Sequence, residues 1–291
     1  MNRKEEERNK KSALSIVMLP LQHTNNLKQP TILQKVKAKK HLGQHFLTDL
    51  DIAKKIVGSL SLVEQYKTVV EVGPGMGVLT QFLIKNKRYQ TILVEIDRES
   101  IGYLVEKYPS LKESIIYGDF LKMDLNEIVS KEPFAVIGNF PYNISSQILF
   151  KVLDFKDQVP VMVGMFQKEV AKRVVADPGS KIYGITSVLI QAFYNIEYLF
   201  TVGPEVFDPP PKVESAVIRL TRNEKAKLDC DEKKFKTIVK MAFGQRRKTM
   251  RNSLRSFLNE ELKKNEVFNL RPEQLSVKEF VDLTNLLGCS D

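Results

Sequence analysis

The chain has 291 residues and a formal net charge of +10, with 43% hydrophobic and 27% charged residues. This composition is typical of a soluble globular protein and leaves room for one large domain plus a smaller one. No apolar run reaches the length of a membrane span, so we expect no membrane association. The two cysteines and three histidines lack metal-ligand spacing. Their pattern argues against a metal site or a disulfide framework and favours a reducing, cytoplasmic compartment.

The positive charge is concentrated at the two ends of the chain. Residues 1–40 carry a net charge of +7, residues 41–222 carry −1, and residues 223–291 carry +4. Basic flanks around a neutral body indicate a polyanionic partner, because phosphate contacts dominate such binding. Solvated basic tails remain the alternative. We expect residues 1–38 to form a basic, disordered extension of unknown role, within which Met18 offers an alternative start.

Apolar runs alternate with amphipathic stretches through most of the chain. Strands are expected at 69–72, 91–94, 114–117, 134–137 and 159–166, and helices at 50–60, from 78, at 99–108 and at 167–175. Two β-rich segments, 194–202 and 215–220, are expected to complete the sheet. Alternating strands and helices of this length indicate βαβ units. The predicted fold class is therefore α/β, with a doubly wound, Rossmann-like parallel sheet.

A linker at residues 222–232 precedes a stretch with a helical period throughout. Two apolar stripes recur at helical spacing: Phe235, Ile238, Val239 and Ala242, then Met250, Leu254, Phe257 and Leu258. Such stripes are typical of amphipathic helices. We therefore expect a catalytic domain at 39–222 and a small all-helical domain at 223–291.

A glycine-rich segment lies between the first strand and the next helix. Its sequence from Glu71 to Gly77 is EVGPGMG, with the spacing G-x-G-x-G. Glu95 follows 24 residues after Glu71, at the end of the second strand, where an acidic residue can bind both hydroxyls of a ribose. Asp119 ends the third strand, where its carboxylate can accept a hydrogen bond from an adenine amine. These strand ends together predict a site for a ribose-adenine ligand.

S-adenosyl-L-methionine fits this set of residues better than a nicotinamide dinucleotide does. The glycine spacing differs from the G-x-G-x-x-G of dinucleotide sites, and no phosphate needs binding. A nicotinamide oxidoreductase is accordingly the least favoured alternative.

The fourth strand is followed by a short polar and aromatic segment, Asn139-Phe140-Pro141-Tyr142. The Asn139 side-chain oxygen and a carbonyl near Pro141 can each accept a hydrogen bond from an exocyclic amine. Tyr142 offers a face for stacking, which contributes about 1–3 kcal/mol per base. In isolation, a turn that ends the strand explains the same residues equally well.

The sequence resembles the KsgA-type ribosomal RNA adenine dimethyltransferase family from about Lys39 to Leu287. The matching segments are residues 43–47, 71–80, 94–98, 118–120, 139–145, 166–170, 206–213, 215–217 and 242–254. The resemblance implies an S-adenosyl-L-methionine site made by His45, Leu47, Gly73, Glu95, Asp119 and Asn139. It also implies a pocket for the target adenine made by Asn139, Pro141, Tyr142 and Phe207. Phe140 stands where the family usually has leucine, and we expect it to pack beneath the pocket.

The resemblance further implies the substrate. It is two adjacent adenosines in a hairpin loop near the 3′ end of small-subunit (16S) rRNA, each methylated twice at N6. The expected partner is an immature 30S-type particle, bound by a monomer with a role in ribosome biogenesis. The cationic side chains expected to contact the rRNA backbone are Arg246, Arg247, Lys248, Arg251 and Arg255. Arg247, Arg251 and Arg255 are predicted at i, i+4 and i+8 of one helix, although a solvated helix face has the same pattern.

Two other functions use the same strand-end residues. One is an Erm-type methyltransferase that acts on large-subunit rRNA. The other is a ribosome-assembly factor that binds RNA without turnover. The segment 242–254 favours the KsgA type over the Erm type, and the complete set of pocket residues favours retained catalysis.

Overall fold

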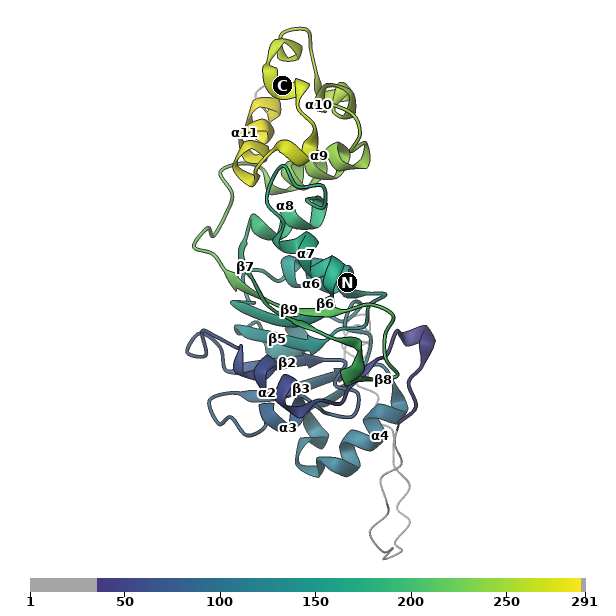
Figure 1. The fold of residues 1–291 in the computed structure, drawn as a ribbon. Helices are drawn as coiled ribbons and strands as arrows, with labels where there is room; N and C mark the ends of the chain where they lie inside the picture. Colours follow the sequence, from purple (N-terminus) through teal and green to yellow (C-terminus); the bar gives the residue numbers. More distant parts are fainter. Residues whose placement is uncertain (1–35, 289–291) are drawn as a thin grey trace, which may run out of the picture. The chain divides into compact units, whose positions relative to one another are not determined.

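The protein is described from a computed structural model that covers residues 36–288 (Figure 1). The predicted extension at 1–38, including Met18, lies outside this range except for its last three residues. A seven-stranded sheet has the order β4-β3-β2-β5-β6-β9-β7. Its strands are β2 (Thr68–Val72), β3 (Gln90–Glu95), β4 (Ile115–Tyr117), β5 (Phe134–Asn139), β6 (Val161–Gln167), β7 (Tyr194–Val202) and β9 (Ser215–Arg222). The expected Rossmann-like α/β class is confirmed.

The prediction of a parallel sheet does not hold at one edge, where the two β-rich segments lie. Strands β4, β3, β2, β5 and β6 are parallel to one another, but β9 is antiparallel to both β6 and β7. Parallel neighbours need a crossover connection, usually a helix, whereas antiparallel neighbours do not. The connection from β7 to β9 holds only a short 3-10 turn and the two-residue strand β8, so β9 returns along its neighbour.

Helices cover both faces of the sheet. They are α2 (Leu50–Gly58), α3 (Thr80–Leu83), α4 (Arg98–Lys107), α5 (Asn126–Val129), α6 (Ser145–Asp154), α7 (Lys168–Val175) and α8 (Ile185–Gln191). Side chains along each strand point alternately into two buried cores, one on each face of the sheet. Val69 and Ile137 pack with α2 and α3, whereas Val70 and Val136 pack with α6 and α8. Burial on both faces explains why the strands read as continuous apolar runs.

Strand β2 marks the point where the strand order reverses, with β3 on one side and β5 on the other. Ligands in open α/β sheets bind at the carboxyl ends of the strands beside such a point. The structure therefore brings the segments that follow β2, β3, β4 and β5 to one edge. A two-stranded antiparallel pair, β1 (Phe46–Leu47) with β8 (Phe207–Asp208), also forms.

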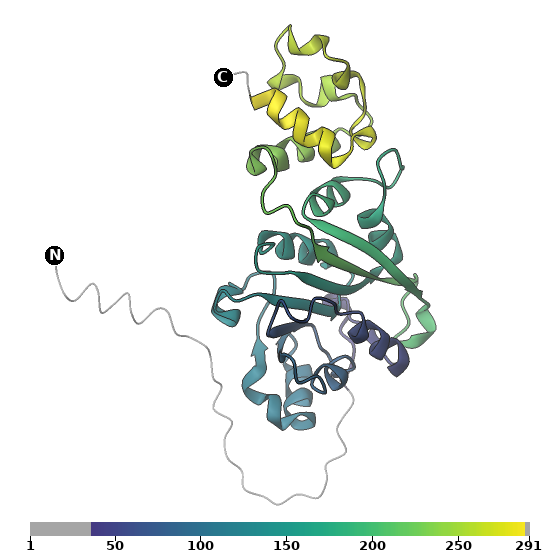
Figure 2. The same ribbon diagram turned by 90° about the vertical axis from the view of Figure 1, so that its left-hand side faces the viewer.

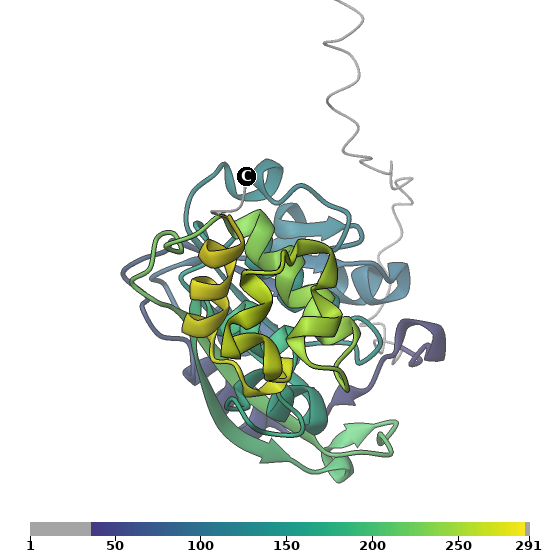
Figure 3. The ribbon, with the colours of Figure 1, turned by 90° about the horizontal axis from the view of Figure 1, so that it is seen from above.

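The C-terminal segment is helical, as its apolar stripes predicted. It contains α9 (Glu232–Gly244), α10 (Met250–Ser253) and α11 (Val277–Gly288). Figure 2 shows the yellow-green helices beside the hairpin of α7 and α8, and Figure 3 shows the yellow α11 alongside α9. One buried apolar cluster runs from Val136 of the sheet through Val188 of α8 to Ile238 of α9.

Short 3-10 turns complete the described chain. They are η1 (Lys40–Leu42), η2 (Pro109–Ser114), η3 (Pro204–Val206), η4 (Arg255–Phe257), η5 (Leu262–Lys264), η6 (Glu266–Asn269) and η7 (Pro272–Gln274). Among residues 36–288, no helix combines the length and apolar character needed to cross a membrane.

The prediction that three arginines share one helix is wrong. Helix α9 ends at Gly244, Arg247 lies in the following turn, and Arg255 lies in η4. The Met250 N–H donates to the Leu270 carbonyl over 2.8 Å, which ties the start of α10 to the segment after η6. Met250 is also fully buried. The start of α10 is therefore held against the core, and α10 is a separate helix from α9.

Candidate active site

The glycine loop after β2 forms the floor of a pocket. Gly73 and Gly75 have positive φ values of 67° and 55°, a conformation that glycine adopts without strain. A side chain at Gly75 would meet the Phe46 ring at 2.8 Å, so packing also requires glycine there. At Gly73 the nearest atom to an added Cβ would be Cδ of Pro141, 4.0 Å away. The backbone at Gly73 is therefore open to close approach by a ligand.

Glu95 is held rigidly at the end of β3. Its Oε2 accepts a hydrogen bond from Gly75 N over 3.0 Å, and its Oε1 accepts from Ile96 N and Asp97 N, each over 2.9 Å. Burial raises the pKa of the Glu95 carboxyl, and the three N–H donors oppose that shift. A carboxylate accepts about four hydrogen bonds, and three are used here, so one acceptor position, on Oε2, remains for a ligand hydroxyl.

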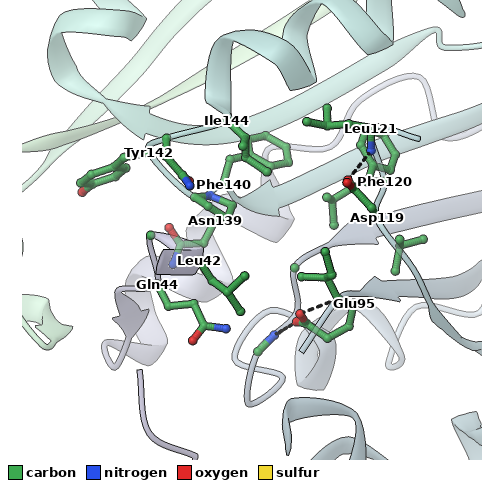
Figure 4. A pocket seen from close by; sticks show the side chains of 18 of the residues that line it. Leu42, Gln44, Glu95, Asp119, Phe120, Leu121, Asn139, Phe140, Tyr142 and Ile144 are labelled. Carbon is green, nitrogen blue, oxygen red and sulfur yellow. Dashed lines mark hydrogen bonds between the residues drawn. The ribbon is translucent and has the colours of Figure 1, made fainter. Parts of the chain in front are cut away.

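The remaining strand-end residues line the same pocket. Figure 4 shows Glu95 and Asp119 on one side, Tyr142 on the other, and Asn139 between them. Asp119 Oδ1 accepts a hydrogen bond from Leu121 N over 3.0 Å, and Lys122 Nζ lies 3.6 Å from its Oδ2. The structure thus gathers Gly73, Glu95, Asp119 and Asn139 around one cavity, as the strand ends predicted.

Asn139 is the last residue of β5, which runs two residues beyond the predicted strand at 134–137. Its Nδ2 donates to the His45 carbonyl over 2.9 Å, which leaves Oδ1 as an acceptor. The Pro141 carbonyl accepts from Ile144 N over 3.2 Å and retains its second lone pair. Both oxygens keep acceptor capacity, one on each side of Phe140 in the chain, and can receive the two N–H groups of an amine.

Phe140 packs beneath the pocket, as expected from its apolar character. Its side chain is 1% exposed, and its ring centroid lies 5.1 Å from that of Phe166. An added Cβ at Gly138 or Gly164 would come within 2.6 Å or 2.3 Å of the Phe140 ring. These glycines pair with each other across β5 and β6. Their lack of side chains provides the room for phenylalanine at this position.

Residues 41–46 line the pocket. Side chains in and beside this segment are held to Asp97, two residues after the end of β3, a contact that the sequence did not predict. Lys39 Nζ lies 2.5 Å from Asp97 Oδ1, and Gln44 Nε2 donates to Asp97 Oδ2 over 3.4 Å. Burial alone would raise the pKa of the Asp97 carboxyl, but the Lys39 ammonium beside it holds the pKa below its usual range. The pair joins residues 58 positions apart, so no local pattern indicates it.

His45, Leu47 and Phe207 differ in how they relate to the pocket. His45 lines it, and its ring centroid lies 5.3 Å from that of Tyr142. Leu47 and Phe207 face each other across β1 and β8, with exposed fractions of 3% and 4%. Both pack into a buried core cluster and are not among the residues that line the pocket. Their contacts with cofactor and target base stay predictions.

A family model described as ribosomal RNA adenine dimethylase matches residues 35–287. The chain belongs to this family. The site is consistent with the family's chemistry, because an adenine dimethylase needs acceptors for an exocyclic amine and a place for a methyl donor. This dimethylase uses S-adenosyl-L-methionine as that donor and ribosomal RNA as its substrate.

The dimethylase is similar to proteins named ribosomal RNA small subunit methyltransferase A. It is 60% identical over 257 residues to the ribosomal RNA small subunit methyltransferase A of Cytophaga hutchinsonii, covering 88% of this chain and 99% of the relative. The protein of the same name from Phocaeicola vulgatus is 58% identical over 252 residues, covering 86% and 89%.

Two solved structures share the fold of the dimethylase. A dimethyladenosine transferase from Plasmodium falciparum superposes with a TM-score of 0.69 at 24% identity, covering 84% of this chain and 98% of its own. The 23S rRNA methyltransferase ErmE superposes with a TM-score of 0.62 at 25% identity, covering 82% and 99%.

Glu71 is a further buried carboxyl in the glycine segment. It is 1% exposed, accepts a hydrogen bond from Thr80 Oγ1 over 2.6 Å, and burial raises its pKa from the usual 4.5 to about 8. Between these pH values the folded dimethylase keeps a proton that the unfolded chain has lost. The free energy of unfolding should therefore fall as the pH rises through this window, by about 1.4 kcal/mol per pH unit.

Glu71→Gln should remove this contribution. Thermal unfolding of the variant and the native dimethylase, followed at pH 5, 6, 7 and 8, should show a smaller decrease in melting temperature with pH for the variant. The same pH dependence in both proteins would mean that Glu71 is ionised across the whole range.

Proposed function

We propose that this dimethylase methylates N6 of two adjacent adenosines, twice each, in the 3′-end hairpin loop of small-subunit rRNA. The arrangement at Asn139 carries the chemical part of the proposal. Its Nδ2 donates to the His45 carbonyl, so its Oδ1 is left as an acceptor in the pocket that Pro141 also lines. The relatives named small subunit methyltransferase A support the choice of subunit, at 55–60% identity.

The cofactor half of the pocket would hold the donor by its ribose and adenine. Glu95 Oε2 would accept a hydrogen bond from a ribose hydroxyl, Asp119 would accept one from the adenine amine, and the bare backbone at Gly73 would allow close approach. S-adenosyl-L-methionine supplies a methyl group on a positively charged sulfur. The residues at this half bind and orient the donor; they take no proton.

The base half of the pocket would prepare the amine for attack. An adenine amine is a poor nucleophile because its lone pair is delocalised into the ring. Hydrogen bonds to Asn139 Oδ1 and the Pro141 carbonyl would favour a pyramidal nitrogen whose lone pair faces the methyl group. Most of the acceleration would then come from positioning, with an electrostatic part from the two oxygens as positive charge develops on the nitrogen. The alkylated amine is acidic and releases its proton to water.

The basic turn between α9 and α10 is the proposed rRNA contact. Arg247, Lys248 and Arg255 are exposed. Arg246 donates to the Ser180 carbonyl over 3.4 Å, and Arg251 donates to Asn269 Oδ1 over 2.8 Å. The exposed three can reach phosphates directly, whereas Arg246 and Arg251 also support the fold around the turn. We propose residues 223–291 as the part that docks on rRNA and residues 39–222 as the catalytic part.

Arg247→Ala should weaken rRNA binding and reduce its dependence on salt, because each lost phosphate contact lowers the slope of log affinity against log salt by about 1. Binding to small-subunit rRNA would be measured at several potassium chloride concentrations. Lys112→Ala, at an exposed lysine of η2, serves as the control. An Arg247→Ala slope equal to that of the control would remove this turn from the rRNA site.

The assignment to the small subunit is tested by transfer from labelled S-adenosyl-L-methionine to undimethylated small and large subunits in parallel. Nuclease digestion and mass spectrometry would map the product. We expect N6,N6-dimethyladenosine in the 3′-end hairpin of small-subunit rRNA. Transfer only to the large subunit would assign the Erm-type activity, and cofactor binding without transfer would indicate an assembly factor.

The proposal also covers the oligomeric state of the enzyme, its compartment and the particle on which it acts. We propose that the enzyme acts as a monomer in the cytoplasm on an immature 30S-type particle. Immature and mature small subunits, offered at equal concentration, would test the last point.

A further inference from the structure

A pair of hydroxyl groups lies behind the base half of the pocket. Tyr142 Oη and Ser215 Oγ are 2.5 Å apart, and either can be the donor. Tyr142 lines the pocket, whereas Ser215 is fully buried and does not. Ser215 belongs to none of the residue sets assigned above to cofactor, base or rRNA.

Ser215 is among the most firmly placed residues at this edge of the sheet. It is the first residue of β9, where it pairs with Gln167 of β6 on one side and with Val202 of β7 on the other. The next residue back, Glu214, is tied to Lys168 by an ion pair of 2.6 Å and by a backbone hydrogen bond of 2.9 Å. The Ser215 hydroxyl is therefore a fixed point of the sheet.

Tyr142 has no such support from a strand. It lies between the end of β5 at Asn139 and the start of α6 at Ser145. The Ser145 hydroxyl donates to the Tyr142 carbonyl over 2.9 Å, which fixes the backbone but not the ring. The ring is contacted by His45 at a tilt of 31°, and its far end is held by Ser215.

We propose that Ser215 is a positioning residue that fixes the ring of Tyr142 in the orientation needed to stack on the target adenine. The proposal rests on the base pocket proposed above. Small misplacements of reacting groups have large effects on rate, about 100-fold for a shift of 1 Å. A ring free to swing about its Cα–Cβ bond would let the base and its amine move by a fraction of that distance.

The second methyl transfer should depend on this support more than the first. Adenine has two N–H groups at N6, one each for Asn139 Oδ1 and the Pro141 carbonyl. N6-methyladenine has one N–H left, so one of these two hydrogen bonds is lost. Stacking on Tyr142 then carries a larger share of the positioning.

A double-mutant cycle tests the proposal. Ser215→Ala, Tyr142→Phe and the double variant would be compared with the native enzyme in single-turnover transfer to undimethylated small subunits at saturating cofactor. Ser187→Ala removes another fully buried hydroxyl, one that donates to the Arg173 carbonyl away from the pocket, and serves as the structural control.

Each single variant should slow the first transfer about 10-fold and the second transfer further, so that N6-methyladenosine accumulates. The double variant should be no slower than either single variant, since all three lack the same hydrogen bond. Cofactor affinity should change less than 2-fold. Ser187→Ala should leave the ratio of singly to doubly methylated product unchanged.

Several results would overturn the role of Ser215. One is a double variant whose transfer rate falls by the product of the two single losses. Another is an unchanged ratio of singly to doubly methylated product. The third is a loss of rate that follows the loss of thermal stability, as in Ser187→Ala. If the native enzyme methylates only large subunits, the small-subunit assignment fails. The same cycle on large subunits then decides the Ser215 proposal separately.

Discussion

Asn139→Ala is expected to lower methyl transfer by at least about 100-fold, the usual effect of removing one preorganised polar group at a reacting centre. The variant loses the oxygen that would orient the target amine. It also loses the 2.9 Å hydrogen bond from Nδ2 to the His45 carbonyl, so a smaller drop in cofactor affinity is expected. Affinity for rRNA should stay close to native, because the basic turn after α9 is untouched.

The measurement is single-turnover transfer, with cofactor affinity and rRNA affinity determined on the same preparations. Asn195→Ala is the matched control, since Asn195 is exposed on β7 and does not line the pocket. Thermal unfolding of both variants separates chemistry from folding. A slow Asn139→Ala enzyme that has also lost stability and cofactor binding would show that Asn139 mainly supports the structure.

The sheet and the strand-end residues could be predicted from sequence for one physical reason. Parallel strands place their carboxyl ends at one edge, so Gly73, Glu95, Asp119 and Asn139 had to meet once the order of strands and helices was known. Their distances in the chain did not matter.

Features that depend on packing between distant segments could not be predicted in the same way. The Lys39–Asp97 ion pair and the Tyr142–Ser215 hydroxyl pair each join residues more than 50 positions apart. Phe207 is a candidate stacking residue only through the family resemblance. Its side chain packs in the buried core beside Leu47, and its contact with the target base stays a prediction.

The prediction that Arg247, Arg251 and Arg255 share one helix was wrong for a related reason. A spacing of four is necessary for one helix face but does not show that the helix is continuous. The buried side chain of Met250 and its backbone bond to Leu270 decide where α10 begins. Neither can be read from the period of the sequence.

Glu95→Gln is expected to weaken cofactor binding by about 10- to 150-fold, because a hydrogen bond to a charged group contributes about 1.5–3 kcal/mol and one ribose hydroxyl would be affected. The amide also disturbs the protein itself. Both oxygens of Glu95 accept hydrogen bonds from backbone N–H groups, and in glutamine one of them is replaced by an NH2 group. That NH2 group would face another donor, either Gly75 N or the pair Ile96 N and Asp97 N. The glycine loop should therefore lose its fixed contact with β3.

Calorimetric titration with S-adenosyl-L-methionine and with S-adenosylhomocysteine would measure the effect. Both ligands carry the same ribose, so both affinities should fall together. Glu106→Gln, an exposed position on α4 that does not line the pocket, supplies a control that also removes one negative charge. Affinity for rRNA should remain native in both variants. A selective loss for the sulfonium ligand alone would instead mean that Glu95 acts on the positive charge of the donor, and the ribose would then have to be held elsewhere.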